Sequence, residues 1–235
     1  MSTEPLSKTD DHQGLDAGRP AAFFDVDGTL LQVNSARLWV EDARRRGELG
    51  RRDMLKALVW LLRYKLALVE LDAILEDVRG YIQGMREDAL RERADRWYVE
   101  DVRQHLVPQV VEALRWHQAQ GHVVALLTAA TSYLCAPLAE ELGVEHVLCT
   151  RLEAEDGVLT GALDRPICYG AGKVVLAERW AEAHDVSLAR SFFYTDSYTD
   201  LPMLQRVGTR VAVAPDPRLR RWARQEGVKI LNLAH

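Results

Sequence analysis

Short apolar runs that alternate with amphipathic helical patterns are the feature that most constrains the fold of this chain. The first run, Ala21–Phe24, is followed directly by Asp25. Buried strands separated by helices form parallel sheets that are covered on both faces. We therefore predict an α/β fold with a Rossmann-like, doubly wound parallel sheet. The later runs that we predict as strands are His122–Thr128, Val144–Cys149, Ser191–Asp196, Thr209–Ala214 and Val228–Leu231.

Helical periodicity fills most of the segments between these runs. The predicted helices are Gln109–Gln120, Ser132–Leu142, Lys173–His184, Asp200–Val207 and Pro217–Gln225. One segment, Arg151–Leu163, interrupts the alternation and has Asp156-Gly157 at its centre. Because Asp-Gly between apolar residues favours a tight two-residue turn, we predict a β-hairpin there.

A longer interruption is helical throughout. Residues 35–106 show no strand pattern. One helical stripe is formed by Leu55, Leu58, Val59, Leu62, Leu66 and Val69. Further helices are predicted at Leu38–Arg46, Leu71–Gln83 and Glu87–Trp97. The segment is too long for a crossover connection, so we predict an inserted helical subdomain. The predicted division is a disordered arm at 1–19, an α/β core at 20–33 and 107–235, and a helical cap at 34–106.

Charge and hydropathy exclude several classes of protein. The chain of 235 residues has 30 basic and 35 acidic residues, and its net charge is −5. Because the two signs are interspersed, the sequence argues against nucleic acid as the main partner. The most apolar stretch, 54–69, is interrupted by three basic residues and is shorter than the ~20 apolar residues that a membrane span needs. We therefore predict no membrane span.

The cysteine pattern points to a reducing compartment. Cys135, Cys149 and Cys168 are odd in number and widely spaced, which disfavours both a disulfide framework and a zinc knuckle. Free thiols are typical of the cytoplasm. We therefore predict a cytoplasmic protein. A monomer and a homodimer both agree with the sequence.

Polar residues whose side chains can take part in catalysis follow several of the predicted strands. Asp25 and Asp27 belong to Asp25-Val26-Asp27-Gly28-Thr29-Leu30, and Gly28 permits a tight loop in which both carboxylates face one pocket. Such a pair can divide the tasks of nucleophile and general acid–base. The further candidates at strand ends are Thr128, Lys173, Asp196 and Asp200. Taken singly, each has a structural alternative as a helix cap, a first-turn lysine or a helix-start acid.

The order of these residues resembles the haloacid dehalogenase-like (HAD) hydrolase superfamily, in the branch that includes phosphoserine phosphatase. The first motif is Asp25 to Leu30, the second is Thr128, the third is Lys173 and the fourth is Asp196-Ser197-x-x-Asp200. The helical insert is similar to the small cap of that branch. The resemblance implies a phosphatase that hydrolyses a small phosphomonoester.

The resemblance also implies roles for the individual residues. Asp25 is the expected nucleophile, which becomes an aspartyl-phosphate, and Asp27 the expected general acid and base. The expected ligands of Mg²⁺ are Asp25, Asp196 and the backbone carbonyl of Asp27. Thr128 and Lys173 are expected to bind the phosphoryl oxygens, and Asp200 to support the metal site or Lys173. Hard oxygen ligands suit Mg²⁺, and phosphoryl transfer mainly needs positioning and neutralisation of charge.

Three departures from the phosphoserine enzymes bear on the substrate. Those enzymes place a glutamate shortly after the first motif, whereas this chain has Asn34 in the corresponding stretch; Thr128-Ala129-Ala130 replaces their Ser-Gly-Gly, and Thr195 replaces the glycine before the fourth motif. We therefore expect Asn34 to influence specificity and phosphoserine to be a poor substrate. By overall pattern, histidinol-phosphate-type phosphatases are more similar. A phosphotransferase or mutase on the same scaffold, and a phosphoacceptor signalling domain, remain alternatives.

Overall fold

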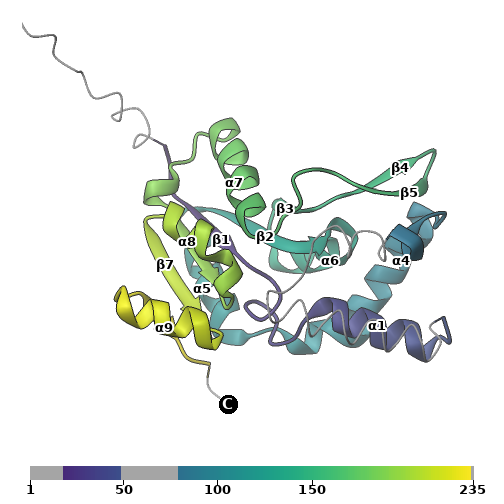
Figure 1. Ribbon diagram of the computed structural model, residues 1–235, viewed down its shortest axis with the longest axis horizontal. Helices are drawn as coiled ribbons and strands as arrows, with labels where there is room; N and C mark the ends of the chain where they lie inside the picture. Colours follow the sequence, from purple (N-terminus) through teal and green to yellow (C-terminus); the bar gives the residue numbers. More distant parts are fainter. Residues whose placement is uncertain (1–17, 49–78, 234–235) are drawn as a thin grey trace, which may run out of the picture.

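A six-stranded parallel sheet forms the centre of the protein (Figure 1). The computed structural model describes residues 18–48 and 79–233. The strand order is β3-β2-β1-β6-β7-β8. The strands are β1 Ala21–Phe24, β2 Val123–Thr131, β3 His146–Thr150, β6 Phe192–Thr195, β7 Thr209–Val213 and β8 Lys229–Leu231. The doubly wound α/β fold predicted from the sequence is confirmed.

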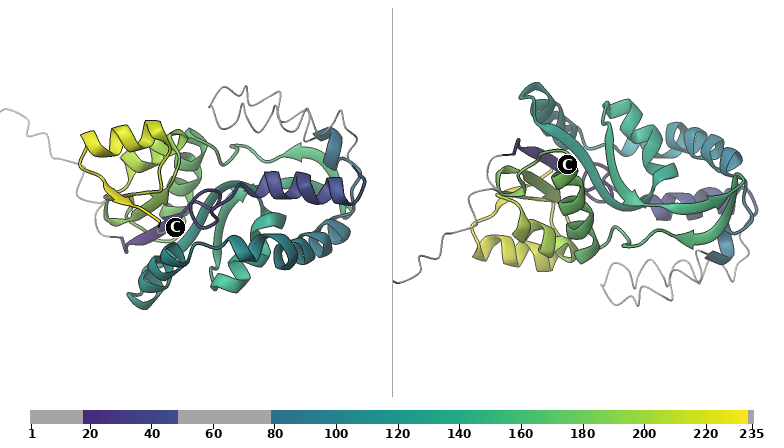
Figure 2. Two further views of the ribbon diagram at one scale, coloured as in Figure 1. Left: turned by 90° about the horizontal axis from the view of Figure 1, so that it is seen from below. Right: turned by 90° about the horizontal axis from the view of Figure 1, so that it is seen from above.

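Helices cover both faces of this sheet (Figure 2). The covering helices are α5 Pro108–Ala119, α6 Ser132–Leu142, α7 Ala171–Ala183, α8 Leu201–Arg206 and α9 Pro217–Gln225. Ala22 and Phe24 of β1 belong to the core cluster that α5 and α6 share, while Ala21 and Phe23 belong to the cluster of α7, α8 and α9. Because each buried phenylalanine contributes roughly 1.5–3 kcal/mol by leaving water, this short strand is held firmly from both sides.

The strand register brings the predicted site residues to one edge. Phe24 of β1 lies beside Leu126 of β2 and Tyr194 of β6. Since the strands are parallel, the residues that follow these three positions meet at the carboxyl edge of the sheet. In such sheets, ligands bind at this edge.

The second strand is longer than the sequence predicts. We expected Thr128 to end it, but β2 continues to Thr131. The pairing with β3 is irregular between Thr128 and Thr131, which is typical of a bulge. Thr128 therefore lies within the strand, at the point where regular pairing stops.

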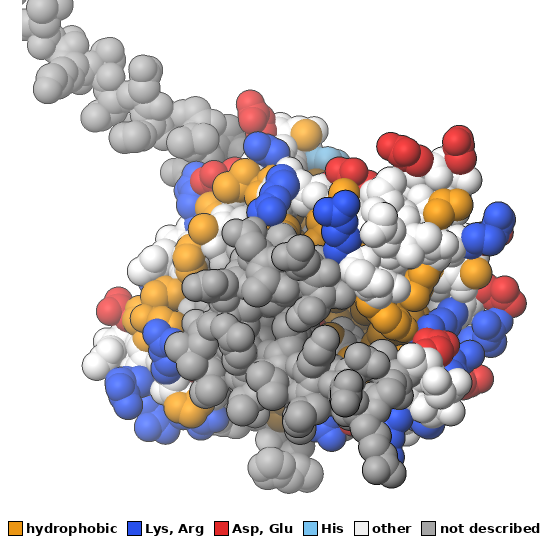
Figure 3. Space-filling view, turned by 45° about the vertical axis from the view of Figure 1, so that its right-hand side comes forward, with side chains coloured by type: hydrophobic (Ala, Val, Ile, Leu, Met, Phe, Trp, Pro, Cys, Tyr) orange, Lys and Arg blue, Asp and Glu red, His pale blue; other side chains and the backbone are white. Residues whose placement is uncertain are grey.

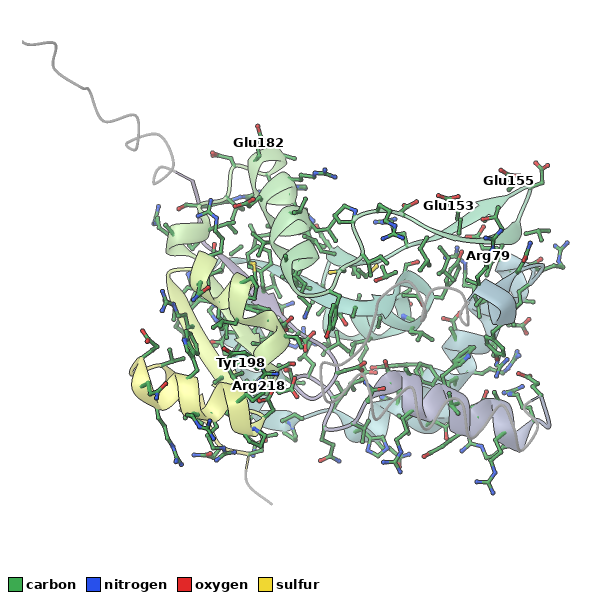
Figure 4. All side chains as sticks on the ribbon, viewed as in Figure 1. Arg79, Glu153, Glu155, Glu182, Tyr198 and Arg218 are labelled. Atoms are coloured by element: carbon green, nitrogen blue, oxygen red, sulfur yellow. The ribbon has the colours of Figure 1, made fainter. Side chains whose placement is uncertain are left out.

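The predicted hairpin is present as β4 Leu152–Glu155 and β5 Val158–Leu163. Asp156 and Gly157 have positive φ values of 49° and 75°, as this kind of turn requires. The hairpin lies against the helical segment, because the Gly84 amide donates to the Leu159 carbonyl at 2.9 Å and the Glu87 amide donates to the Gly157 carbonyl at 2.8 Å. Figure 4 shows Arg79 beside this hairpin.

The segment predicted as a cap is helical where the structure describes it. It contains α1 Ser35–Arg45, a helical turn at 79–82, α4 Glu87–Trp97, the π-helix Tyr98–Val102 and the 3₁₀-helix Arg103–His105. Buried Asp42 of α1 accepts hydrogen bonds from Arg46 and from Arg93 of α4, so it ties the two helices together. The predicted helical stripe at 55–69 and most of the helix at Leu71–Gln83 lie outside the described residues. The boundaries of the cap stay a prediction.

The helices, the surface charges and the cysteines of the described residues agree with the predictions made from composition. None of the helices in the described ranges is long and apolar enough to cross a membrane. Figure 3 shows basic and acidic side chains interspersed over the described part of one face. Cys135, Cys149 and Cys168 are free, as predicted, and all three are buried.

Candidate active site

A tight loop after β1 carries the first two candidate acids. The Asp25 amide donates to the Tyr194 carbonyl of β6 at 2.9 Å, and the chain then turns so that the Leu31 amide donates to the Val26 carbonyl. Gly28 has a φ of +80°, and a Cβ at this position would lie 2.3 Å from Asp196 Oδ2. Glycine is therefore required both by the backbone conformation and by the close approach of the Asp196 carboxylate.

Lys173 lies between two carboxylates at the carboxyl edge. Its Nζ donates to Asp25 Oδ1 at 2.8 Å and to Asp200 Oδ2 at 2.7 Å. The side chain comes from the first turn of α7, while Asp25 follows β1 and Asp200 lies after β6. All three residues are buried, with exposed fractions of 6% for Asp25, 3% for Lys173 and 1% for Asp200. The sequence prediction that these residues meet is confirmed by the geometry.

Burial and charge set the protonation of this cluster. Burial raises the pKa of Asp25 to about 7, although the charge of Lys173 opposes the rise. Burial alone would lower the pKa of Lys173, but the charges of Asp200 and Asp25 outweigh it and hold that pKa well above its usual range. Lys173 is therefore a fixed cation, and Asp25 is a carboxylate that changes charge near neutral pH when no metal is bound.

Asp27 is held by the beginning of α1. Its Oδ1 accepts a hydrogen bond from the Ser35 amide at 2.8 Å, and its Oδ2 accepts bonds from Ser35 Oγ at 3.1 Å and Asn34 Nδ2 at 3.3 Å. Burial raises the pKa of Asp27, while the two bonds from Ser35 lower it. The carboxylate is thus oriented by the first residues of the segment predicted as a cap.

Asn34 uses both ends of its side chain within the protein. Its Oδ1 accepts a hydrogen bond from the Arg37 amide at 3.1 Å and so caps α1, while its Nδ2 reaches Asp27. Asparagine is a favoured residue at this position because it satisfies an amide that has no partner within the helix. The specificity role expected from the sequence stays a prediction, to which the structure adds contact with Asp27.

Asp196 and Thr128 complete the edge. Asp196 Oδ1 accepts a hydrogen bond from Thr29 Oγ1 at 3.4 Å, and the Asp196 carbonyl accepts one from the Asp216 amide at 2.8 Å. Burial and the charge of Asp25 raise the pKa of Asp196 well above its usual range. Thr128 is buried, and its Oγ1 accepts a hydrogen bond from the Ala130 amide at 3.2 Å. Figure 4 labels Tyr198, which follows Asp196 in the chain, and Arg218 of α9, whose guanidinium carbon lies 4.5 Å from the centroid of the tyrosine ring.

Three hydroxyl residues at this edge were missed by the sequence reasoning as site residues. They are Thr29, Ser35 and Thr195, whose hydroxyls donate to Asp196, Asp27 and Asp200 respectively. The only signal available was their position beside the motifs, because a single serine or threonine produces no periodic pattern. Each of them orients one of the candidate acids.

The residues at this edge fit a magnesium ion. In the part of the chain that the structure describes, no group of three or more His, Cys, Asp or Glu side chains is arranged to hold a metal. The predicted ligand set does not need three such side chains, since it combines the Asp25 and Asp196 carboxylates with the backbone carbonyl of Asp27. Burial and the charge of Asp25 both raise the pKa of Asp196, and a cation held by these two carboxylates would offset the repulsion between them. Hard oxygen donors with room for water are typical of Mg²⁺ sites.

The fold and the site together define a class of protein. A doubly wound sheet that gathers carboxylates and one buried lysine at its carboxyl edge is the framework of an α/β enzyme acting on a small anion. The family model of the haloacid dehalogenase-like hydrolases matches residues 22–205. The chain therefore belongs to this family, and it is a phosphatase of that family.

Relatives in sequence carry two different substrate names. A phosphoserine phosphatase of Mycobacterium tuberculosis is 35% identical over 214 residues, which cover 89% of this chain and 70% of that protein. A histidinol-phosphatase of Neisseria meningitidis is 26% identical over 216 residues, which cover 90% of this chain and 97% of that protein. The phosphatase class is thus shared by both relatives, while their named substrates differ.

Solved structures agree with the fold. A protein of unknown function from Bordetella pertussis has a TM-score of 0.84 and 30% identity, with 92% of this chain and all of that chain covered (100%). A substrate-bound phosphoserine phosphatase has a TM-score of 0.67 and 17% identity, covering 91% of this chain and 92% of that chain. The second likeness supports the fold alone.

Proposed function

We propose that this chain is a Mg²⁺-dependent phosphomonoesterase that hydrolyses a small phosphate ester through an aspartyl-phosphate at Asp25. The observation that carries the proposal is the buried ammonium of Lys173, 2.8 Å from Asp25 Oδ1 and 2.7 Å from Asp200 Oδ2. An anionic phosphate can approach an anionic nucleophile only where such charge is neutralised. The lysine also favours the ionised form of Asp25 that a nucleophile needs.

The two carboxylates divide the chemistry between them. A carboxylate oxygen of Asp25 forms a bond to phosphorus as the ester P–O bond breaks. Asp27 donates a proton to the departing alcohol oxygen. In the second half of the reaction, Asp27 takes a proton from water, and the water oxygen forms a new bond to phosphorus. The bond between phosphorus and Asp25 then breaks, so that phosphate leaves and the Asp25 carboxylate is restored. Ser35 and Asn34 hold Asp27 for these transfers, and general acid–base help of this kind contributes about 10²–10⁴-fold.

The remaining residues bind the phosphoryl group and its metal. Lys173 has three N–H donors, and two of them donate to carboxylates. The third is available to a phosphoryl oxygen beside Thr128. Asp25, Asp196 and the carbonyl of Asp27 would hold Mg²⁺. When bound, this ion supplies charge that offsets the repulsion between phosphate and carboxylate. Asp200 keeps Lys173 in place.

The substrate is proposed to be a small phosphomonoester enclosed between the core and the cap of residues 34–106. Relatives named as phosphoserine phosphatase and histidinol-phosphatase support this size class. Asn34 is proposed to weaken recognition of phosphoserine, because a neutral amide lacks the charge-assisted bond that a glutamate offers to an amine. The cytoplasmic location and the monomeric or dimeric state also stay predictions.

A phosphate-release assay tests the proposal. The purified chain is given p-nitrophenyl phosphate, histidinol phosphate, phosphoserine and sugar phosphates, each with Mg²⁺ and with excess EDTA. The proposal predicts repeated turnover of at least one ester with Mg²⁺ and none with EDTA. A single stoichiometric burst would support the phosphoacceptor alternative, and transfer to an added alcohol would support the phosphotransferase alternative.

A further inference from the structure

The hydroxyl of Thr195 makes a contact that the proposed mechanism does not yet use. Thr195 is the last residue of β6 and is fully buried, with an exposed fraction of 0%. Its Oγ1 donates to Asp200 Oδ2 at 2.7 Å. This is the same carboxylate oxygen that accepts the bond from Lys173 Nζ. The contact therefore joins a strand end to the partner of the candidate phosphate-binding lysine.

The direction of each bond follows from the groups involved. A threonine hydroxyl has one proton, and an ionised carboxylate only accepts, so the proton points to Asp200. The oxygen of the hydroxyl accepts a second bond, from the Ser197 amide at 3.2 Å. Thr195 thus connects the backbone just after Asp196 to the Asp200 carboxylate. The hydroxyl and the lysine thus hold the carboxylate through the same oxygen, Oδ2.

The orientation of the lysine depends on this arrangement. Lys173 has no rigid fork of donors, and its ammonium turns freely unless its partners are fixed. Two of its donors are committed to Asp25 and Asp200, so the positions of those carboxylates decide where the third donor points. If Asp200 rotates, the third donor rotates as well. A hydroxyl that stops this rotation affects phosphate binding without touching phosphate.

We propose that Thr195 is a positioning residue, whose hydroxyl fixes Asp200 and thereby directs the Lys173 ammonium toward the phosphoryl group at Asp25. The inference rests on the proposed phosphatase function. Thr195 stands where the resemblance to the phosphoserine enzymes leads us to expect glycine, and glycine has no hydroxyl with which to make this contact.

Removing the hydroxyl without changing the shape of the side chain tests the proposal. Hydrogen bonds to charged groups are strong, so Thr195→Val is expected to lower kcat/KM for p-nitrophenyl phosphate by roughly 10- to 100-fold. It is expected to weaken inorganic phosphate binding, measured by calorimetry with Mg²⁺, by a similar factor. Thr195→Ser keeps the hydroxyl and is expected to stay within about threefold of the wild type in both assays.

A matched control is available in β3. Thr150 is also the last residue of a strand and is buried, but within the described residues its Oγ1 has no hydrogen-bond partner. Thr150→Val removes an equivalent hydroxyl that does not orient any acid. Its kcat/KM and phosphate affinity are expected to match those of the wild type.

A double-mutant cycle shows whether Thr195 acts through Asp200. In an Asp200→Asn background, Thr195→Val is expected to change phosphate affinity by less than about threefold, because the group that it positions is already altered. If Thr195→Val does not fold, as judged by circular dichroism, Thr195→Cys takes its place, since a thiol is a weak donor of similar size.

Two failures can be told apart in these assays. An active wild type with an equally active Thr195→Val variant would overturn the Thr195 proposal alone, as would a loss that serine does not restore. An equal loss in the Asp200→Asn background would show that Thr195 does not act through Asp200. A wild type that releases no phosphate from any ester would overturn the proposed function and this inference with it.

Discussion

Replacing Asp25 by asparagine is expected to abolish turnover and, in the absence of metal, to stabilise the folded protein at alkaline pH. A neutral amide is not a nucleophile, so the phosphoenzyme cannot form. The stability effect has a separate cause. Asp25 is buried, and its charged form is tolerated less well in the fold than in the unfolded chain even with Lys173 beside it. Asparagine removes that charge and keeps nearly the same shape.

The size of the stability effect follows from the raised pKa. The pKa of Asp25 rises from 3.8 to about 7 on folding. Because the folded state holds this proton more tightly, the wild type loses stability as the pH rises from about 4 to about 7, and the loss is complete above 7. At about 1.36 kcal/mol per pKa unit, the advantage of Asp25→Asn is on the order of 1 kcal/mol at pH 4.5 and 4 kcal/mol at pH 8.5.

Urea unfolding at the two pH values, with EDTA present, measures this effect. The free energy of unfolding is compared for the wild type, Asp25→Asn and the control Asp95→Asn, which removes an exposed carboxylate from α4. The control is expected to show no advantage that grows with pH. An Asp25→Asn variant that is no more stable than the wild type at pH 8.5, or equally favoured at both pH values, would contradict a raised pKa of Asp25 in the folded protein.

Four further predictions concern the acid, its support, the metal and the substrate. Asp27→Asn should lower kcat/KM by about 10²–10⁴-fold for alkyl phosphates and by much less for p-nitrophenyl phosphate, whose leaving group needs no proton; equal losses in steady-state kinetics would contradict the acid role. Ser35→Ala removes one of the bonds that lower the pKa of Asp27, so this pKa should rise; kcat/KM for alkyl phosphates should then fall by roughly 3- to 10-fold, and an unchanged rate would argue against it. EDTA should stop phosphate release and Mg²⁺ restore it, with Ca²⁺ a poor substitute; full activity in excess chelator would exclude the magnesium requirement. Asn34→Glu should raise kcat/KM for phosphoserine relative to uncharged alcohol phosphates, although its charge beside Asp27 should lower both; an unchanged ratio would show that the substrate is recognised elsewhere.

The sheet and the acid–lysine cluster were predictable from the sequence because both depend on regular patterns. Runs such as Ala21–Phe24 are apolar at every position, which is typical of strands buried on both faces. Parallel strands then oblige the residues after them to meet at one edge. Asp25 and Asp200 were therefore expected to converge, and both accept hydrogen bonds from Lys173. The lysine was also placed at a strand end, but it lies in the first turn of α7 and reaches the edge from that helix.

Contacts made by single polar side chains were not predictable in this way. Asn34 was interpreted as a residue that faces the substrate, and the beginning of the following helix was placed at Leu38 instead of Ser35. The same asparagine is a strong N-cap residue, and that competing preference explains the earlier start of the helix. The hydroxyls of Ser35 and Thr195 donate to acids across loops, at sequence separations of 8 and 5 residues, and the periodicity of strands or helices does not predict such contacts.

Local irregularity and long-range packing account for the other differences. Ala129–Thr131 extends β2 beyond Thr128 through irregular pairing with β3, and small residues there leave no strand signal. The hairpin was predicted from Asp156-Gly157, but its attachment to residues 84–87 depends on backbone hydrogen bonds between segments far apart in the chain. Such contacts follow from the assembled fold and not from any local window.

Trapping the phosphorylated enzyme identifies the residue that carries the phosphoryl group. The wild type is mixed with Mg²⁺ and an ester that it hydrolyses, and the reaction is quenched within a single turnover. Borohydride then reduces the acyl phosphate of aspartate to homoserine. Peptide mass spectrometry then locates the altered residue. An aspartyl-phosphate at Asp25 predicts homoserine at position 25 and none in Asp25→Asn. Modification of a different residue, or continued turnover with no modified residue at any quench time, would contradict it.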